Sequence, residues 1–271
     1  MITITNLDFS YRKNRKLFEK LSWKVASGYV YGLLGKNGAG KTTLMKLISG
    51  LLKPDSGMVD VNGYQPFGRT PDFLGRLIFI PEEFSVPSMR IEEFVKHYSP
   101  FYEHFDLDKF YRYLKEFEID SDFNPLLSSL SYGQKKKVLI AFAFASGTPL
   151  LILDEPTNGL DIPSKAVFRR LCIDALNGER TFIISTHQVK DVERILDRIT
   201  VLDRGRIISN DSVENISTRY ECKFQEQLPQ EGVLYYEKTL GGYKTITLNT
   251  SGSQSALDIE LYFNAMIKQN S

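Results

Sequence analysis

Apolar and polar residues alternate in the first part of the chain, as they do in β-strands that bury one face. The alternation covers residues 2–4, 7–9 and 21–25, which we therefore expect to form strands. Residues 29–34 are a nearly continuous apolar run, typical of a buried strand. A glycine-rich segment follows, and residues 42–48 have the composition of a helix start. The pattern thus predicts a strand, a glycine-rich loop and a helix in succession.

Further along, the pattern predicts an α/β chain. Residues 77–80, 150–153 and 181–185 are expected to be strands, and the fully apolar run at 150–153 is typical of a parallel sheet covered on both faces. Between them, Leu107, Phe110, Leu114 and Phe117 recur at helical spacing. This spacing indicates the core face of a helical subdomain at about residues 85–147. Exposed aromatic residues of this region could instead line a groove for a partner: Tyr98, Phe101, Tyr102 and Tyr111.

The last 60 residues or so have a different pattern. Residues 235–236 and 244–248 suggest strands, residues 241–242 a turn, and residues 256–267 a terminal helix. We expect a small α+β appendage from about residue 213 to 271, with a regulatory role or a role in dimer formation.

Composition narrows the class of protein. The 271 residues include 34 basic and 33 acidic side chains, so no charge footprint favours a nucleic acid or an anionic membrane as partner. The two cysteines, Cys172 and Cys222, lie far apart without metal-type spacing, which fits a reduced cytosolic compartment. The N-terminus has no signal-peptide pattern. The longest apolar run, residues 138–145, is far shorter than the roughly 20 residues of a membrane helix. We therefore expect a protein that does not itself span a membrane.

The glycine-rich segment fits the phosphate-loop pattern G-x-x-x-x-G-K-[ST] at every fixed position. Its backbone N–H groups and the following helix N-terminus can surround a phosphate. Lys41 can reach the outer phosphates of a nucleoside triphosphate, and the Thr42 hydroxyl suits Mg²⁺. The segment comprises Gly35, Lys36, Asn37, Gly38, Ala39, Gly40, Lys41 and Thr42.

Carboxylates follow two of the expected strands. Asp154 can hold Mg²⁺ through water, and Glu155 can orient or polarise an attacking water. Glu82 follows residues 77–80, where it could be solvated or could face a metal or water. His187 follows the strand at 181–185; a lone histidine there is usually structural, but this one is expected beside the phosphate loop and Glu155.

Three other features could belong to the site or be structural, namely Tyr11, Ser131 and the lysines at 135–137. Tyr11 could be an ordinary edge aromatic or a face on which adenine stacks. Ser131 is well placed to cap a helix whose N-terminus can point at an anion. The lysines at 135–137 are expected to form a solvated helix face rather than a binding patch.

Over residues 1 to about 212 the chain resembles the ATP-binding subunit of an ABC transporter. Seven segments of that family occur in the same order. They are Tyr11 as the A-loop, residues 35–42 as Walker A, Pro81 and Glu82 as the Q-loop, residues 130–134 as the signature, residues 150–155 as Walker B, Gly159, Leu160 and Asp161 as the D-loop, and His187 as the switch histidine.

The resemblance implies an α/β P-loop NTPase fold with a mainly parallel sheet, an N-terminal antiparallel β subdomain and a helical subdomain. Residues 1–212 would form the ATPase domain and residues 213–271 an accessory α+β extension. It also implies ATP and Mg²⁺ as cofactors. ATP would be bound by Tyr11, the phosphate loop and Thr43, Mg²⁺ by Thr42, Asp154 and Glu82, and hydrolysis would depend on Glu155 and His187.

The family further implies a head-to-tail dimer, of two copies or of homologous subunits, that sandwiches two ATP molecules. Ser131 and Gly133, with Gln134, would then face the γ-phosphate held by Lys41 of the other subunit. A separate transmembrane permease would keep the dimer at the inner face of the cell membrane. No nucleic-acid partner is expected.

Two positions depart from the family pattern. Glu82 stands where glutamine is usual, and an ionised carboxylate can only accept hydrogen bonds. It could bind the metal more directly, so we expect the coupling chemistry there to differ from that of the family. Tyr132 stands where glycine is commoner, and we expect it to be tolerated because Gly133 keeps the closer backbone approach.

The function that this resemblance favours is ATP hydrolysis for a membrane exporter of the two-gene type. An ABC ATPase that drives assembly of another protein complex, as in iron–sulfur cluster machinery, is the alternative. Translation-associated members normally carry two cassettes, whereas this chain has one phosphate loop. DNA-repair members insert long coiled coils, and no sustained heptads occur here. A neighbouring gene for a multi-span permease would favour transport.

Overall fold

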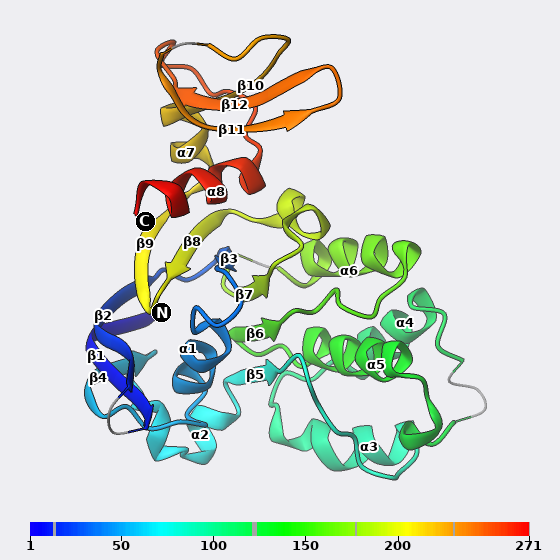
Figure 1. The fold of residues 1–271 in the computed structure, drawn as a ribbon. Helices are drawn as coiled ribbons and strands as arrows, with labels where there is room; N and C mark the ends of the chain where they lie inside the picture. The colour runs from blue at the N-terminus through cyan, green and yellow to red at the C-terminus, as the bar shows by residue number, and fades with distance from the viewer. Residues whose placement is uncertain (13–14, 121–123, 177, 230, 271) are drawn as a thin grey trace.

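A six-stranded sheet lies at the centre of the computed structural model, which describes residues 1–12, 15–120, 124–176, 178–229 and 231–270 (Figure 1). The strands are parallel except the last, β9, which runs antiparallel to β8. All residues of the inner strands β6, β7 and β3 are buried, which explains their apolar runs. In spatial order the strands are β5 (Leu77–Ile80), β6 (Leu150–Asp154), β7 (Thr181–Thr186), β3 (Val30–Leu34), β8 (Arg198–Asp203) and β9 (Arg206–Ser212).

Helices cover both faces of this sheet. Tyr31 and Leu33 of β3 belong to a core shared with α1 (Lys41–Ile48), whereas Val30 and Leu34 belong to a core shared with α5 (Tyr132–Ala145) and α6 (Ile162–Ala175). Figure 1 shows α1 and α5 on opposite sides of the sheet. The alternation of strand side chains thus divides one strand between two hydrophobic cores.

A second, antiparallel sheet of order β2-β1-β4 packs on the α1 side. It comprises β1 (Ile2–Arg12), β2 (Arg15–Val25) and β4 (Ser56–Val61). The two alternating runs at 2–4 and 7–9 belong to one strand, because register shifts between Ile4 and Leu7 bend β1 without ending it. Tyr11 therefore lies inside β1 and not after it.

The helical region consists of α3 (Ile91–Tyr98), α4 (Leu107–Glu116) and the first half of α5. Phe110, Leu114 and Phe117 are buried, as predicted, but Leu107 is 48% exposed. That part of the prediction was wrong because Leu107 is the first residue of α4, directly after the cap Asp106, and lies outside the packed turns. The remaining short elements are α2 (Pro71–Leu74) and the 3₁₀ turns Pro66–Gly68, Ser99–Phe101, Leu127–Ser129, Val189–Asp191 and Glu193–Ile195.

A third, smaller sheet of order β10-β12-β11 forms near the C-terminus. The strands of this sheet are β10 (Tyr220–Gln225), β11 (Val233–Thr239) and β12 (Gly242–Leu248). The helix α7 (Val213–Arg219) precedes them in the chain, and α8 (Ile259–Gln269) follows them. Helix α8 lies between this sheet and the central sheet (Figure 1), where the Tyr262 hydroxyl bonds to Ser209 Oγ of β9 at 2.7 Å. The helix starts three residues later than predicted because the Asp258 side chain caps it.

These three sheets and their helices confirm the predicted fold class. None of the helices among the described residues is long and apolar enough to cross a membrane.

Arg180 is a buried cation that connects the ends of the large helices to the central sheet. It lies just before β7 and is 6% exposed. Its guanidinium donates to four backbone carbonyls, of Ala143, Phe144, Thr148 and Ala175. A planar group with five N–H donors suits this arrangement, because the last carbonyls of a helix have no partner within the helix.

Replacing Arg180 by methionine should lower the free energy of unfolding by about 3–5 kcal/mol, because several buried carbonyls lose their donors at once. Urea unfolding followed by circular dichroism measures this. The matched change Arg194→Met removes an exposed arginine and should stay within about 0.5 kcal/mol. Equal stabilities of the two variants would contradict the role of Arg180.

Candidate functional site

The phosphate-loop segment connects the carboxyl end of β3 to the first residue of α1. Gly40, which precedes the helix, has φ +109°, a backbone conformation that L side chains rarely adopt. A Cβ atom at Gly35 would lie 2.5 Å from the carbonyl oxygen of Leu202. Glycine is therefore required at both positions, for two different reasons, and the loop can wrap closely before α1.

Lys41 is the first residue of α1 and is buried. Its Nζ donates to the carbonyl oxygen of Gly35 at 2.8 Å. Burial lowers the pKa of the ammonium, while the carboxylates of Glu155, Asp154 and Glu82 oppose that shift. The ammonium thus lies inside the loop, where it can donate to phosphate oxygens.

Asp154 ends β6 beside the start of α1. Its Oδ2 accepts a hydrogen bond from Thr42 Oγ1 at 2.6 Å, and its Oδ1 accepts a short bond from Ser185 Oγ. These are hard oxygen donors, the type that Mg²⁺ prefers. Among the described residues no group of three or more His, Cys, Asp and Glu side chains could hold a metal. Thr42 and Asp154 bring two such oxygens within hydrogen-bond distance of each other, which is an arrangement that could hold Mg²⁺.

Glu155 follows Asp154 in a constrained conformation. Its φ is +47°, and its backbone N–H donates to both the carbonyl oxygen and Oγ of Ser185, each at 3.1 Å. The buried carboxylate lies 2.9 Å from His187 Nδ1. The structure therefore brings Glu155 and His187 together, as the sequence predicted.

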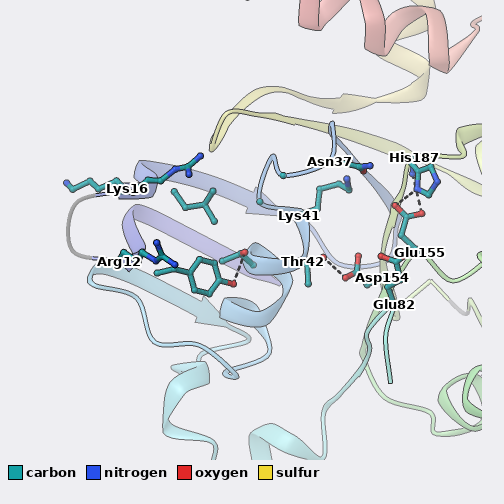
Figure 2. Close-up of a pocket in the computed structure, with 15 residues that line it drawn as sticks. Arg12, Lys16, Asn37, Lys41, Thr42, Glu82, Asp154, Glu155 and His187 are labelled. Carbon is teal, nitrogen blue, oxygen red and sulfur yellow. Dashed lines mark hydrogen bonds and ion pairs between the residues drawn. The ribbon is translucent and has the colours of Figure 1, made fainter. Parts of the chain in front are cut away.

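A cavity of about 740 Å³ joins these groups. Figure 2 shows Lys41, Thr42, Asp154 and Glu155 facing it, with His187 beyond Glu155. It is lined by Tyr11, Arg12, Arg15, Lys16, Leu17, Asn37, Gly38, Gly40, Lys41, Thr42, Thr43, Glu82, Asp154, Glu155 and His187. Its size and charge distribution suit a nucleoside triphosphate.

Tyr11 lines the same cavity as the carboxylates. Its hydroxyl bonds to Thr43 Oγ1 at 3.0 Å, and the residue is 62% exposed. Three basic side chains from the same hairpin, Arg12, Arg15 and Lys16, line the cavity beside it. Sequence reasoning missed this basic rim, although the charges that surround Tyr11 in the chain were a signal for it.

Glu82 lines the cavity opposite the phosphate loop. Its Oε1 accepts a hydrogen bond from Asn158 Nδ2 at 2.9 Å. One carboxylate oxygen is therefore engaged by Asn158, the residue directly before the D-loop. The replacement of the usual glutamine thus changes a group that already has a fixed partner.

Ser131 caps α5, as predicted. Its Oγ accepts from the Gln134 backbone N–H at 3.2 Å, and the Gln134 side chain accepts from the Ser131 N–H at 2.9 Å. A Cβ at Gly133 would lie 2.7 Å from the carbonyl oxygen of Gly159, so the signature packs closely against the D-loop. Within the described residues, Ser131, Gly133 and Gln134 are outside the lining of the cavity.

The predicted solvated face of lysines at 135–137 was wrong, because Lys135 and Lys137 are partly buried and the central member is fully buried. Lys136 is completely buried, and its Nζ donates to the carbonyl oxygens of Glu155 and Asn158 at 2.6 and 3.0 Å. The reason is its position on α5, which faces the turn after β6. Tyr132, one helical turn earlier, donates its hydroxyl to the carbonyl oxygen of Glu82 and stacks on Phe84.

Comparison with known proteins identifies the family. The sequence model described as "ABC transporter" matches residues 18–158. The ABC transporter ATP-binding protein YdbJ of Bacillus subtilis is 31% identical over 225 residues, covering 82% of this chain and 72% of YdbJ. The SkfA peptide export ATP-binding protein SkfE of the same species is 32% identical over 231 residues, covering 84% and 92%.

A solved structure has the same architecture. The ATP-binding subunit of an ABC transporter superposes with a TM-score of 0.72 at 26% identity, covering 80% of this chain and 91% of that subunit. The chain therefore belongs to the ABC transporter family, as an ATP-binding subunit whose ATP hydrolysis powers a transporter.

Proposed function

We propose that this ATPase drives export through a separate transmembrane permease and that it works as a head-to-tail dimer. The signature of α5 supports the dimer most directly, because Ser131 and Gly133 lie outside the cavity that holds Lys41 and Glu155. An ATP molecule bound by one subunit then needs a second subunit to supply the helix N-terminus that Ser131 caps. Export is supported by relatives such as SkfE, whose name assigns it to peptide export.

The described side chains support a division of roles within the site. Tyr11, the phosphate loop and Thr43 bind ATP. Tyr11 stacks on the adenine, and Lys41 donates hydrogen bonds to the outer phosphates. Thr42 and Asp154 hold Mg²⁺, with Glu82 facing the same region. When bound, Mg²⁺ neutralises charge on the phosphates.

Glu155 is the catalytic base or water-orienting group in this proposal. Its carboxylate is buried, lines the cavity and is held from behind by the imidazole and backbone N–H of His187. A fixed carboxylate can accept a hydrogen bond from a water in line with the γ-phosphate and polarise it. Ser131, Gly133 and Gln134 of the second subunit close the site over the γ-phosphate.

The same proposal assigns residues 1–212 to the ATPase domain, with the helical subdomain at about 85–147. Residues 213–271 form an accessory region that contacts the ATPase domain through α8. The permease would keep the dimer at the inner face of the cell membrane.

The proposed role in transport can be tested in two ways. Transport would be supported by a neighbouring gene for a multi-span permease and by faster ATP turnover on co-expression with that permease. Activity only within another, soluble complex would support the assembly alternative.

Lys41→Ala should weaken ATP binding by about 10- to 100-fold, because a charge-assisted hydrogen bond to the phosphates is lost. Titration with a fluorescent ATP analogue measures the dissociation constant. Lys46→Ala, on the same helix but outside the cavity lining, serves as the control and should bind as the unaltered protein does. An unchanged dissociation constant for Lys41→Ala would refute the phosphate site.

Glu155→Gln should lower ATP turnover by about 10²- to 10⁴-fold, because the amide keeps the shape but cannot accept a proton. Binding groups are unchanged, so uncleaved ATP should accumulate between two subunits. Size-exclusion chromatography of this variant should show a dimer with Mg-ATP and a monomer with ADP. The exposed Glu231→Gln is the control. Near-normal turnover in Glu155→Gln would exclude Glu155 as the catalytic residue.

A further inference from the structure

The buried ammonium of Lys136 lies directly behind the turn that carries Glu155. It projects from the second turn of α5, the helix that the signature begins. Its Nζ is 2.6 Å from the Glu155 carbonyl oxygen, 3.0 Å from that of Asn158 and 5.6 Å from the ring centroid of Tyr132. Lys136 is not among the residues that line the cavity of its own chain. We therefore do not expect it to contact an ATP molecule bound there.

The turn at Glu155 needs such support from outside. A glutamate with φ +47° is in the left-handed region, which L residues other than asparagine and aspartate rarely adopt. On one side Ser185 accepts from the Glu155 N–H; on the other side Lys136 donates to the Glu155 carbonyl oxygen. The two contacts hold the peptide groups before and after the Glu155 Cα, and so they fix the direction in which its carboxylate leaves the backbone.

The ionic surroundings favour a charged Lys136 at neutral pH. Burial lowers the pKa of the ammonium to about 8, and the nearby carboxylates of Glu82, Glu155 and Asp154 limit that shift. A buried ammonium with two carbonyl acceptors is a stable arrangement only while both acceptors stay in place. The charge therefore ties the position of the turn to α5.

The second acceptor, Asn158, extends the connection to the residue directly before the D-loop. Asn158 receives the Lys136 bond at its carbonyl oxygen and donates its side-chain amide to Glu82. The same residue accepts from Gln188, the neighbour of His187, at 3.3 Å. Lys136 thus holds both ends of the 155–158 turn, next to the groups that face the γ-phosphate.

We propose that Lys136 is a positioning residue for ATP hydrolysis, which holds the Glu155 turn from the signature helix so that the carboxylate is aimed at the attacking water. The inference rests on the proposed catalytic role of Glu155. A purely structural cation would stabilise the fold whether or not Glu155 carries a carboxylate, and this difference can be measured.

The test is Lys136→Met, which keeps a long, unbranched side chain in the buried position and removes both hydrogen bonds of the ammonium. Its kcat should fall by about 10- to 100-fold, since a small misplacement of a catalytic group has effects of this size. The KM for ATP and the dissociation constant for a fluorescent ATP analogue should stay close to those of the unaltered protein. Lys135→Met, the same change on the neighbouring and more exposed lysine, should leave kcat unchanged.

A double-mutant cycle with Glu155→Gln separates positioning from structure. If Lys136 acts through the carboxylate of Glu155, then Lys136→Met should lower turnover in the Glu155 background and have no further effect in the Gln background. Equal losses in both backgrounds would overturn the proposal, as would a parallel loss of ATP binding and of the melting temperature.

The two assignments can fail separately. If Glu155→Gln turns over normally, the catalytic role of Glu155 is wrong and Lys136 has no catalytic group to position. If Glu155→Gln is slow but Lys136→Met has the kcat of the unaltered protein, the role of Glu155 stands and only the inference about Lys136 is wrong.

Discussion

The site depends on one constraint, namely that parallel strands end at the same edge of their sheet. The neighbours β6, β7 and β3 run in one direction, so Asp154, His187 and the phosphate loop emerge side by side. Thr42 of the loop and Asp154 are 112 residues apart in the chain. No local interaction could bring them together, and the hydrogen bond between Thr42 and Asp154 is a direct consequence of strand order.

Charge is balanced across this edge by buried groups of both signs. Lys41 approaches the carboxylates from the loop side and Lys136 from the helix side, and burial lowers the pKa of each lysine. The ammonium of Lys41 faces the cavity, whereas that of Lys136 is directed to backbone carbonyls behind it. Two cations of the same type thus have different roles, because one can contact phosphate and the other only the protein.

Helix α5 connects the signature at its N-terminus to the Q-loop and to the turn that carries Glu155. Its N-cap Ser131 is not among the residues that line the cavity of the same chain, while Tyr132 contacts the Q-loop and Lys136 contacts the turn after Walker B. Tyr132 replaces the glycine that is commoner in the family and adds a hydrogen bond and a ring contact to residues 82–84. The helical region and the nucleotide site are therefore joined by side chains specific to this sequence.

The sequence by itself determined the fold class, and it predicted that the phosphate loop, Asp154, Glu155 and His187 belong to one site, because short motifs and apolar periodicity are local properties of the chain. Only the tertiary structure decided which lysine of the run at 135–137 is buried, that Leu107 is exposed, and that basic residues surround Tyr11 at the cavity. Helical spacing alone could not separate Lys136 from its neighbours, since what makes it buried is the 155–158 turn, some 20 residues away in the chain. Burial of a polar side chain depends on partners that fold against it, and those partners are set by the packing of distant segments.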